Sequence, residues 1–135
     1  MPDYMEFTVA ADGSPQGLDA SNANGHTATT NKARTAVGKI ANAISALNIC
    51  DLVGNVWKWL NELLHDPTAA SAAWYDVFGG GYGQAYMYSS TGLHALIGGG
   101  NWNNGVHCGS RTVNCNNYPW NVNTNIGVWC VCDSL

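Results

Sequence analysis

The stretch GGGNWNNGVHCGSR, from Gly98 to Arg111, decides how the rest of this chain is interpreted. It opens a segment with nine asparagines between Asn101 and Asn125, and Arg111 is the single Asp, Glu, Lys or Arg from Val77 to Cys132. Asparagine side chains donate and accept hydrogen bonds, are unfavourable inside helices and tolerate unusual backbone angles. The segment therefore predicts long, ordered loops that the rest of the chain holds in place.

The composition indicates one weakly charged globular domain. The chain has 135 residues, of which 46% are apolar and six are tryptophan, and this is enough for one core. Charged residues make up 10% where roughly 25% is usual, and the net charge is -4. Because there is no basic patch, we expect no nucleic-acid partner. No run is apolar enough to cross a bilayer, and the N-terminus MPDYME lacks the features of a secretory signal, so we expect neither membrane insertion nor a signal peptide in this chain.

The cysteines and histidines show no metal-ligand spacing. There is no CxxC motif, and the four histidines are scattered. We expect buried free thiols, with a disulfide such as Cys108 to Cys115 as the second interpretation, and we expect no metal and no cofactor. The cysteines are Cys50, Cys108, Cys115, Cys130 and Cys132.

Hydrophobic periodicity predicts the elements of the first half. Alternation over residues 4–9 predicts a first strand, and polar composition over residues 12–30 predicts a loop or arm. A helical stripe predicts a helix at about residues 34–47. After a turn at Gly54-Asn55, the segment up to Leu60 predicts a core strand, followed by a polar connection over residues 61–73.

The second half predicts short strands. Trp74 to Phe78 is an aromatic cluster, and residues 85–89 and 93–97 look like two strands joined by the turn at 89–92. The apolar run from Ile126 to Cys132 predicts a final strand that is buried on both faces.

Two motifs resemble one superfamily. GNVWKW (54–59) and GGNW (99–102), the latter continuing to Ile126-Gly127, are similar to the GNVWEW, GGSW and terminal strand of the formylglycine-generating-enzyme branch of the C-type lectin fold, with Lys58 in place of glutamate. The ordered motifs of the last third, including Gly109-Ser110-Arg111 and Cys132-Asp133, more specifically resemble the variable proteins of diversity-generating retroelements. Val128-Trp129 and Asp133-Ser134 depart from the Ala-Arg and Asp-His that this family often has. The resemblance implies an α+β, C-type lectin-like fold with short, mostly antiparallel strands, one or two helices and many loops.

The resemblance also gives the asparagines a meaning. In such retroelements, reverse transcription directed at adenines rewrites a C-terminal variable region, and its usual target codon, AAC, encodes Asn until it is changed. The resemblance implies one domain over residues 1–135, with about residues 98–133 as the variable, ligand-binding region. His107 stands where the family has Asn, and its codon CAC is one base from AAC. Trp120 cannot arise from AAC in this way, and we include it as a contact residue. The candidate ligand-binding positions are Asn101, Asn103, Asn104, His107, Asn114, Asn116, Asn117, Trp120, Asn121, Asn123 and Asn125.

The other motif members are interpreted as scaffold. Trp57 and Trp59 share one face of the core strand, and Trp102 is assigned to the core rather than to a contact surface. Gly127 belongs to the terminal strand, and Arg111 is interpreted as a structural guanidinium that donates to loop carbonyls.

The resemblance favours a binding protein over an enzyme. It implies a non-enzymatic scaffold, displayed on a virion (phage) or cell surface, that binds a protein or other macromolecular ligand such as a receptor on a target surface; its oligomeric state is open. A formylglycine-generating-enzyme-like oxidase is one alternative, but the position two after Trp102, where the enzyme has a cysteine, is Asn104. A calcium-dependent sugar-binding lectin is the other, but residues 101–132 contain no carboxylate.

Overall fold

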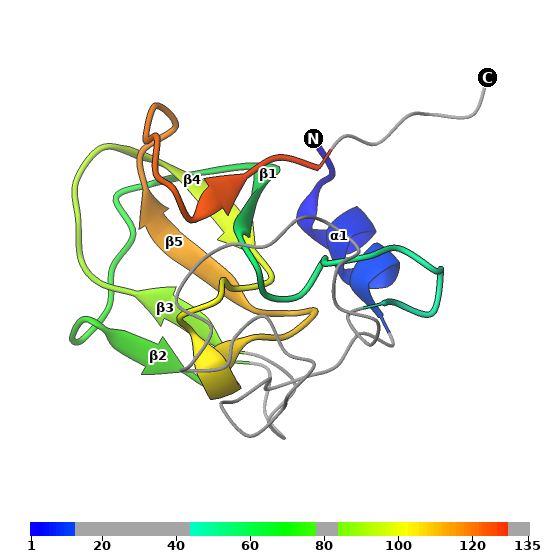
Figure 1. Ribbon diagram of the computed structural model, residues 1–135. Helices are drawn as coiled ribbons and strands as arrows, with labels where there is room; N and C mark the ends of the chain where they lie inside the picture. Colours follow the sequence, from blue (N-terminus) through cyan, green and yellow to red (C-terminus); the bar gives the residue numbers. More distant parts are fainter. Residues whose placement is uncertain (13–43, 78–83, 130–135) are drawn as a thin grey trace.

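The computed structural model describes residues 1–12, 44–77 and 84–129 (Figure 1). In these residues one mixed sheet has the strand order β2-β3-β5-β4-β1-β6, with a helix packed beside it. The prediction of an α+β fold is therefore confirmed. The elements are α1 (Tyr4–Ala11), β1 (Trp57–His65), β2 (Ala73–Tyr75), β3 (Ala85–Met87), β4 (Leu93–Gly98), the 3-10 turn η1 (Gly105–His107), β5 (Val113–Asn117) and β6 (Ile126–Gly127).

The first element is a helix, so the predicted strand at residues 4–9 is wrong. Asp3 caps the helix: its carboxylate accepts from the Glu6 amide at 2.8 Å, and the Glu6 carboxylate accepts from the Asp3 amide at 2.9 Å. This capping box satisfies two amides that a helix start leaves without partners. Phe7 and Ala11, four residues apart, are both fully buried. The alternation over residues 4–9 is a weaker signal than the Asp3 cap and the helical spacing of Phe7 and Ala11.

The predicted helix at residues 34–47 is wrong in the part that the structure describes. Ile44 forms a β-bridge with Cys50, and the Ser45 amide donates to the Ile49 carbonyl at 2.9 Å. Asn48, with φ of 62°, reverses the chain between them. Residues 34–43 and the arm at 13–30 lie outside the described residues.

Strand β1 begins as predicted but runs further. Gly54 (φ 77°) and Asn55 (φ 60°) form the turn before it. The strand continues to His65, through the first part of the predicted polar connection. It does so because Leu63 and Leu64 pair with β4, beyond an irregularity in the register after Trp59.

The two predicted strands at residues 85–89 and 93–97 exist as β3 and β4, but they do not pair with each other. Strand β5 lies between them, parallel to β3 and antiparallel to β4. The last described strand, β6, pairs parallel with the start of β1. Both residues of β6 are half-buried and Val128 is exposed, so the prediction of a strand buried on both faces is wrong for its described part.

The sheet has two different faces. On one face α1 packs against the main core, whose members are Phe7, Ala11, Leu52, Val53, Leu60, Ala85, Leu96, Cys108, Val113 and Cys115. Cross-strand partners share a face, so the register defines a row across the other face. This row comprises Trp59, Ile97, Asn114, Tyr86 and Trp74. In the described part of the chain no helix is long and apolar enough to cross a membrane.

Candidate ligand-binding surface

Two glycines fix the start of the Asn-rich loop. Gly99 and Gly100 have φ of 88° and 81°, a region that side chains disfavour. A Cβ would lie 2.2 Å from the Leu52 carbonyl oxygen at Gly99 and 2.3 Å from the Cys108 Sγ at Gly100. The Gly99 amide also donates to the Thr112 carbonyl at 2.9 Å. The loop therefore leaves β4 in one backbone conformation.

Asn101 and Asn104 shape this loop from within. The Asn101 side chain is 3% exposed. Its oxygen accepts from the Asn103 amide at 2.7 Å, and the Asn101 amide donates to the Asn104 side chain at 2.8 Å. Asn103 is exposed. Of these three candidates, Asn103 presents its side chain to solvent while the other two close the turn.

A bulge in β5 separates its asparagines. Asn114 pairs with Ile97 and Asn117 pairs with Ala95, so β5 holds one more residue than β4 between these pairs. A bulge of this kind re-aims the side chains around it. Asn114 and Asn117 thus share a face, and the Asn117 side-chain nitrogen donates to the Asn114 side-chain oxygen at 3.2 Å.

Asn116, inside the bulge, is buried with 8% exposure. Its oxygen accepts from the Tyr88 amide at 3.3 Å, and its nitrogen has no partner among the described residues. This asparagine ties β5 to the end of β3 and faces away from solvent.

The loop after β5 carries three candidate asparagines. Asn123 is exposed and Asn121 is half-buried, with its side chain donating to the Asn117 oxygen at 3.5 Å. Asn125 is half-buried, and its carbonyl accepts from the Trp57 amide at 2.8 Å. The Asn121 contact joins two side chains, so no backbone hydrogen bond of the sheet involves the side chain at 121 or 123.

A ladder of three rings runs from the interior to this loop. His94 is fully buried and stacks on Tyr118, with ring centroids 4.6 Å apart. Tyr118 stacks on Trp120 at 5.1 Å and 7°. Trp120 is 69% exposed, so one face of its indole is supported and the other is open. Aromatic side chains held in this way are typical contact anchors. The sequence offered no sign that His94 supports Trp120.

His107 lies apart from that ladder, against β2. Its ring stacks on Trp74 with centroids 4.4 Å apart, and its Nδ1 contacts the Gln84 side-chain oxygen. Burial lowers the pKa of His107, so its ring is neutral at neutral pH. The structure thus divides the candidates between a group around β5 and the following loop and a group around η1.

The residues assigned to the scaffold lie in different environments. Trp57 is buried and stacks on Trp74 at 6.3 Å, whereas Trp59 and Trp102 are half-buried. Arg111 has an exposed position, and its carbonyl accepts from the Tyr4 hydroxyl at 3.2 Å. A Cβ at Gly127 would lie 3.0 Å from the Val56 side chain.

Lys58, which stands where the resembled motif has glutamate, is fully buried. Its Nζ donates to the Gly54 carbonyl at 2.5 Å, and burial lowers its pKa to about 7. Burial raises the pKa of the nearby Cys108 thiol to about 12 and that of Cys115 to about 11. Because the thiolate is the reactive form, both thiols are unreactive at neutral pH. Both are free and buried, which confirms the prediction for these two; Cys50 is free but only half-buried, and the other two cysteines lie outside the described residues.

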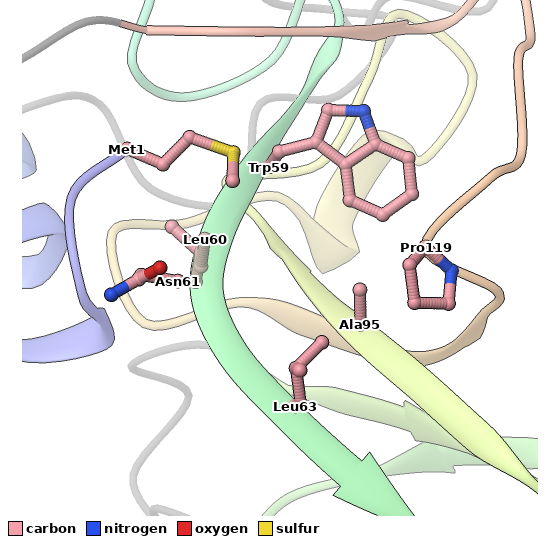
Figure 2. A pocket seen from close by; sticks show the side chains of 7 residues that line it. All are labelled: Met1, Trp59, Leu60, Asn61, Leu63, Ala95 and Pro119. Atoms are coloured by element: carbon pink, nitrogen blue, oxygen red, sulfur yellow. The ribbon is translucent and has the colours of Figure 1, made fainter.

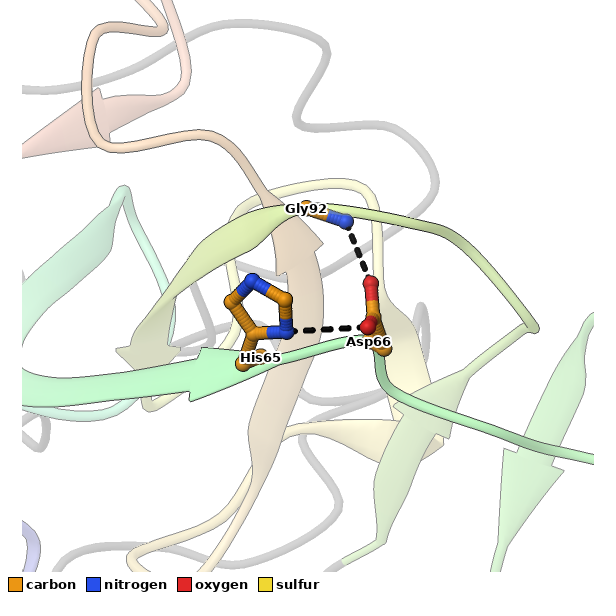
Figure 3. Close-up of polar contacts among 3 residues, drawn as sticks. All are labelled: His65, Asp66 and Gly92. Atoms are coloured by element: carbon orange, nitrogen blue, oxygen red, sulfur yellow. Dashed lines mark hydrogen bonds and ion pairs between the residues drawn. The ribbon is translucent and has the colours of Figure 1, made fainter.

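An exposed polar turn closes the far end of β1. The Asp66 carboxylate accepts from the Gly92 amide at 2.6 Å and contacts the His65 ring at 2.9 Å (Figure 3). The hydrogen bond from Gly92 is the main cause that lowers the pKa of Asp66. Within residues 1–12, 44–77 and 84–129, no group of three or more His, Cys, Asp or Glu side chains is placed to hold a metal ion.

Sequence reasoning missed a pocket of about 270 Å³ beside the β5 loop (Figure 2). Its walls come from four segments: β1, β4, Met1 and the residue after Tyr118. No short motif spans these segments, so the sequence gives no signal for the pocket. The lining residues are Met1, Trp59, Leu60, Asn61, Leu63, Ala95 and Pro119.

Comparison with known proteins agrees with this architecture. The chain belongs to the sulfatase-modifying factor enzyme 1-like domain family, whose model matches residues 2–134. Similar solved structures include the Major Tropism Determinant U1 variant (25% identity, TM-score 0.62), the P3c variant (24%, 0.64) and the M1 variant (22%, 0.63). Each match covers 94% of this chain and 32% of the other, so the chain spans about a third of their length. No curated protein sequence matches the chain. The structural matches confirm the predicted C-type lectin-like fold and the resemblance to variable proteins.

Proposed function

We propose that this chain is a binding protein whose C-terminal asparagine positions are exchanged by a retroelement. One domain would then present many surfaces, with about residues 98–133 as its variable region, to a protein or other macromolecular ligand on a target surface such as a cell-surface receptor. Display on a virion or cell surface suits this role. The similarity to the tropism determinant variants supports it.

The observation that carries the proposal is how the loop after β5 is held. Its backbone bonds are internal: the Asn121 amide donates to the Tyr118 carbonyl at 2.9 Å and the Ile126 amide to the Asn123 carbonyl at 3.3 Å. Side chains can change without loss of such bonds. This supports exchange at Asn121 and Asn123; Asn103, in the loop after β4, is supported by its exposure.

The buried candidates fit a different role within the proposal. Asn101 and Asn116 hold backbone amides inside the fold, so their replacement would alter loop shape before it altered contacts. Trp120 supplies an exposed aromatic anchor, whereas asparagine buries little apolar area. We expect the present sequence to bind weakly and variants with added aromatic side chains to bind tightly.

Binding can be tested by selection. A displayed library with Asn103, Asn121 and Asn123 randomised is selected for binding to a folded protein target. The chain with its present sequence is the control. The proposal expects binders enriched in tyrosine and tryptophan. A library that folds but yields no binder to several protein targets would contradict it. A second test uses the genome. The proposal predicts a near-identical repeat beside a reverse transcriptase gene, and this repeat should differ from the region that encodes residues 98–133 only at adenines.

An oxidase is the second candidate, because the matched family model describes an enzyme-like domain. The chain has Asn104 at the position of the first catalytic cysteine, and burial keeps the Cys108 thiol protonated. We therefore expect no oxidation of a cysteine-containing peptide in the presence of copper. Formation of formylglycine in that peptide, detected by mass spectrometry, would replace the binding proposal with the oxidase.

A further inference from the structure

The apolar pocket lies over β1 and β4, against the loop that carries Trp120. Figure 2 shows Ala95 between the side chains of Leu63 and Pro119, with Trp59 above them. The volume of about 270 Å³ is below that of pockets that enclose a whole small-molecule ligand. It suits a single inserted side chain.

The pocket is continuous with the proposed variable surface, but its lining is not variable. Ala95 pairs directly with Asn117, and Pro119 stands between Tyr118 and Trp120. None of the lining residues is a candidate variable position. Trp59, Leu63 and Ala95 are on paired strands, so the pocket keeps its shape when the loop residues change.

The chemistry of the pocket restricts what can enter it. Six of its seven lining side chains are apolar, Asn61 is polar, and Leu63 is 58% exposed at its mouth. A charged group placed against Trp59, Leu63 and Ala95 would lose hydration there. The occupant is therefore apolar and uncharged.

We propose that this pocket is a constant anchor that takes a leucine-sized or phenylalanine-sized side chain from a loop of a protein partner. This inference rests on the proposed function, in which the surrounding asparagine positions select among partners. A second copy of this chain is a poorer occupant, because a self-contact over the pocket would cover Asn117 and Trp120. Diversification would then disturb self-association whenever it changed binding.

The test measures side-chain analogues at the pocket. N-acetyl-L-leucinamide and N-acetyl-L-phenylalaninamide are titrated into the ¹⁵N-labelled protein, with N-acetyl-L-glutaminamide as a polar probe of similar size. The Trp59 indole N–H resonance reports binding. We expect both apolar probes to shift it with Kd values on the order of millimolar, and the polar probe to leave it in place.

Two variants locate the effect. Leu63→Glu puts a charge at the mouth and should weaken apolar-probe binding about tenfold or more, which is about 1.4 kcal/mol or more. Val9→Glu, an equally exposed apolar position on α1, should leave it unchanged. Leu63→Gln serves if Leu63→Glu does not fold. Equal binding of the polar probe, unchanged binding in both Leu63 variants, or a Trp59 shift on dilution of the protein alone would overturn the proposal.

Failure here is separable from failure of the proposed function. If selected binders keep full affinity with Leu63→Glu, the anchor is wrong and the variable surface stands. If the probes bind but the library yields no binders, the pocket binds apolar side chains and the proposed variable surface is wrong.

Discussion

Single residues decide whether the Asn-rich loop can leave β4 in its observed path. Gly100→Ala would place a Cβ 2.3 Å from the Cys108 Sγ at a φ of 81°. The left-handed backbone costs about 1 kcal/mol for alanine, and displacement of the buried thiol adds about 2 kcal/mol. We expect the free energy of unfolding, measured by urea titration, to fall by about 3 kcal/mol.

Gly92 provides the matched control, because its φ of 92° is similar but a Cβ there meets nothing within 4 Å. Gly92→Ala should cost only about 1 kcal/mol. Equal losses in the two variants would show that packing against Cys108 does not restrict the loop.

Lys58 should make stability depend on pH. Its pKa is about 7 in the folded chain against 10.5 unfolded, so the unfolded chain holds more protons between these values and the free energy of unfolding rises with pH. The raised pKa values of Cys108 and Cys115 oppose this rise above about pH 8, where the unfolded chain begins to lose its thiol protons while the folded chain keeps them. Between pH 7 and 8 we expect a gain of about 1 kcal/mol by urea titration.

The variant Lys58→Met keeps the buried stem and removes the titrating group. Its free energy of unfolding should be nearly flat between pH 7 and 8. A variant with the same rise as the natural chain would place the titration elsewhere.

The residue types predicted some local geometry and missed the rest. Gly54-Asn55 is predicted as a turn, and the positive φ values of both residues agree, because few other residue types adopt them. The burial of Asn101 and Asn116 could not be predicted, because an asparagine that caps a buried amide reads the same as one in solvent.

Among the elements, α1 depends on its cap. Asp3→Ala removes the acceptor of the Glu6 amide and should cost about 1 kcal/mol of unfolding free energy. Met5→Ala, on the exposed side of the same helix, should change it by less than about 0.5 kcal/mol. Thermal unfolding of both variants checks this, and an equal effect would mean that the capping box does not stabilise α1.

Strand existence was easier to predict than strand order. Local apolar runs identified β1, β3 and β4, but β5, at residues 113–117, reads in the sequence as loop because three of its five residues are asparagine. Long-range pairing places β5 between β3 and β4. These two strands, which the sequence predicts as a hairpin, therefore pair with β5 and not with each other.

At the scale of the whole molecule, the resemblance to a known family predicted more of the fold than hydrophobic periodicity did. The motifs GNVWKW and GGNW predicted the C-type lectin-like fold that the structural matches confirm. They could not predict the pocket, whose walls meet only through the sheet, nor the division of the candidate positions between β5 and η1. Both are products of tertiary pairing.

The central claim is that a fixed scaffold carries exchangeable side chains at its accessible asparagines. It is tested most directly by two displayed libraries of equal size, one randomised at Asn121 and Asn123 and the other at Asn101 and Asn116, each scored for the fraction of members that resist protease. We expect most members of the first library to stay folded and most members of the second to unfold. Equal loss of folded members in the two libraries would contradict it.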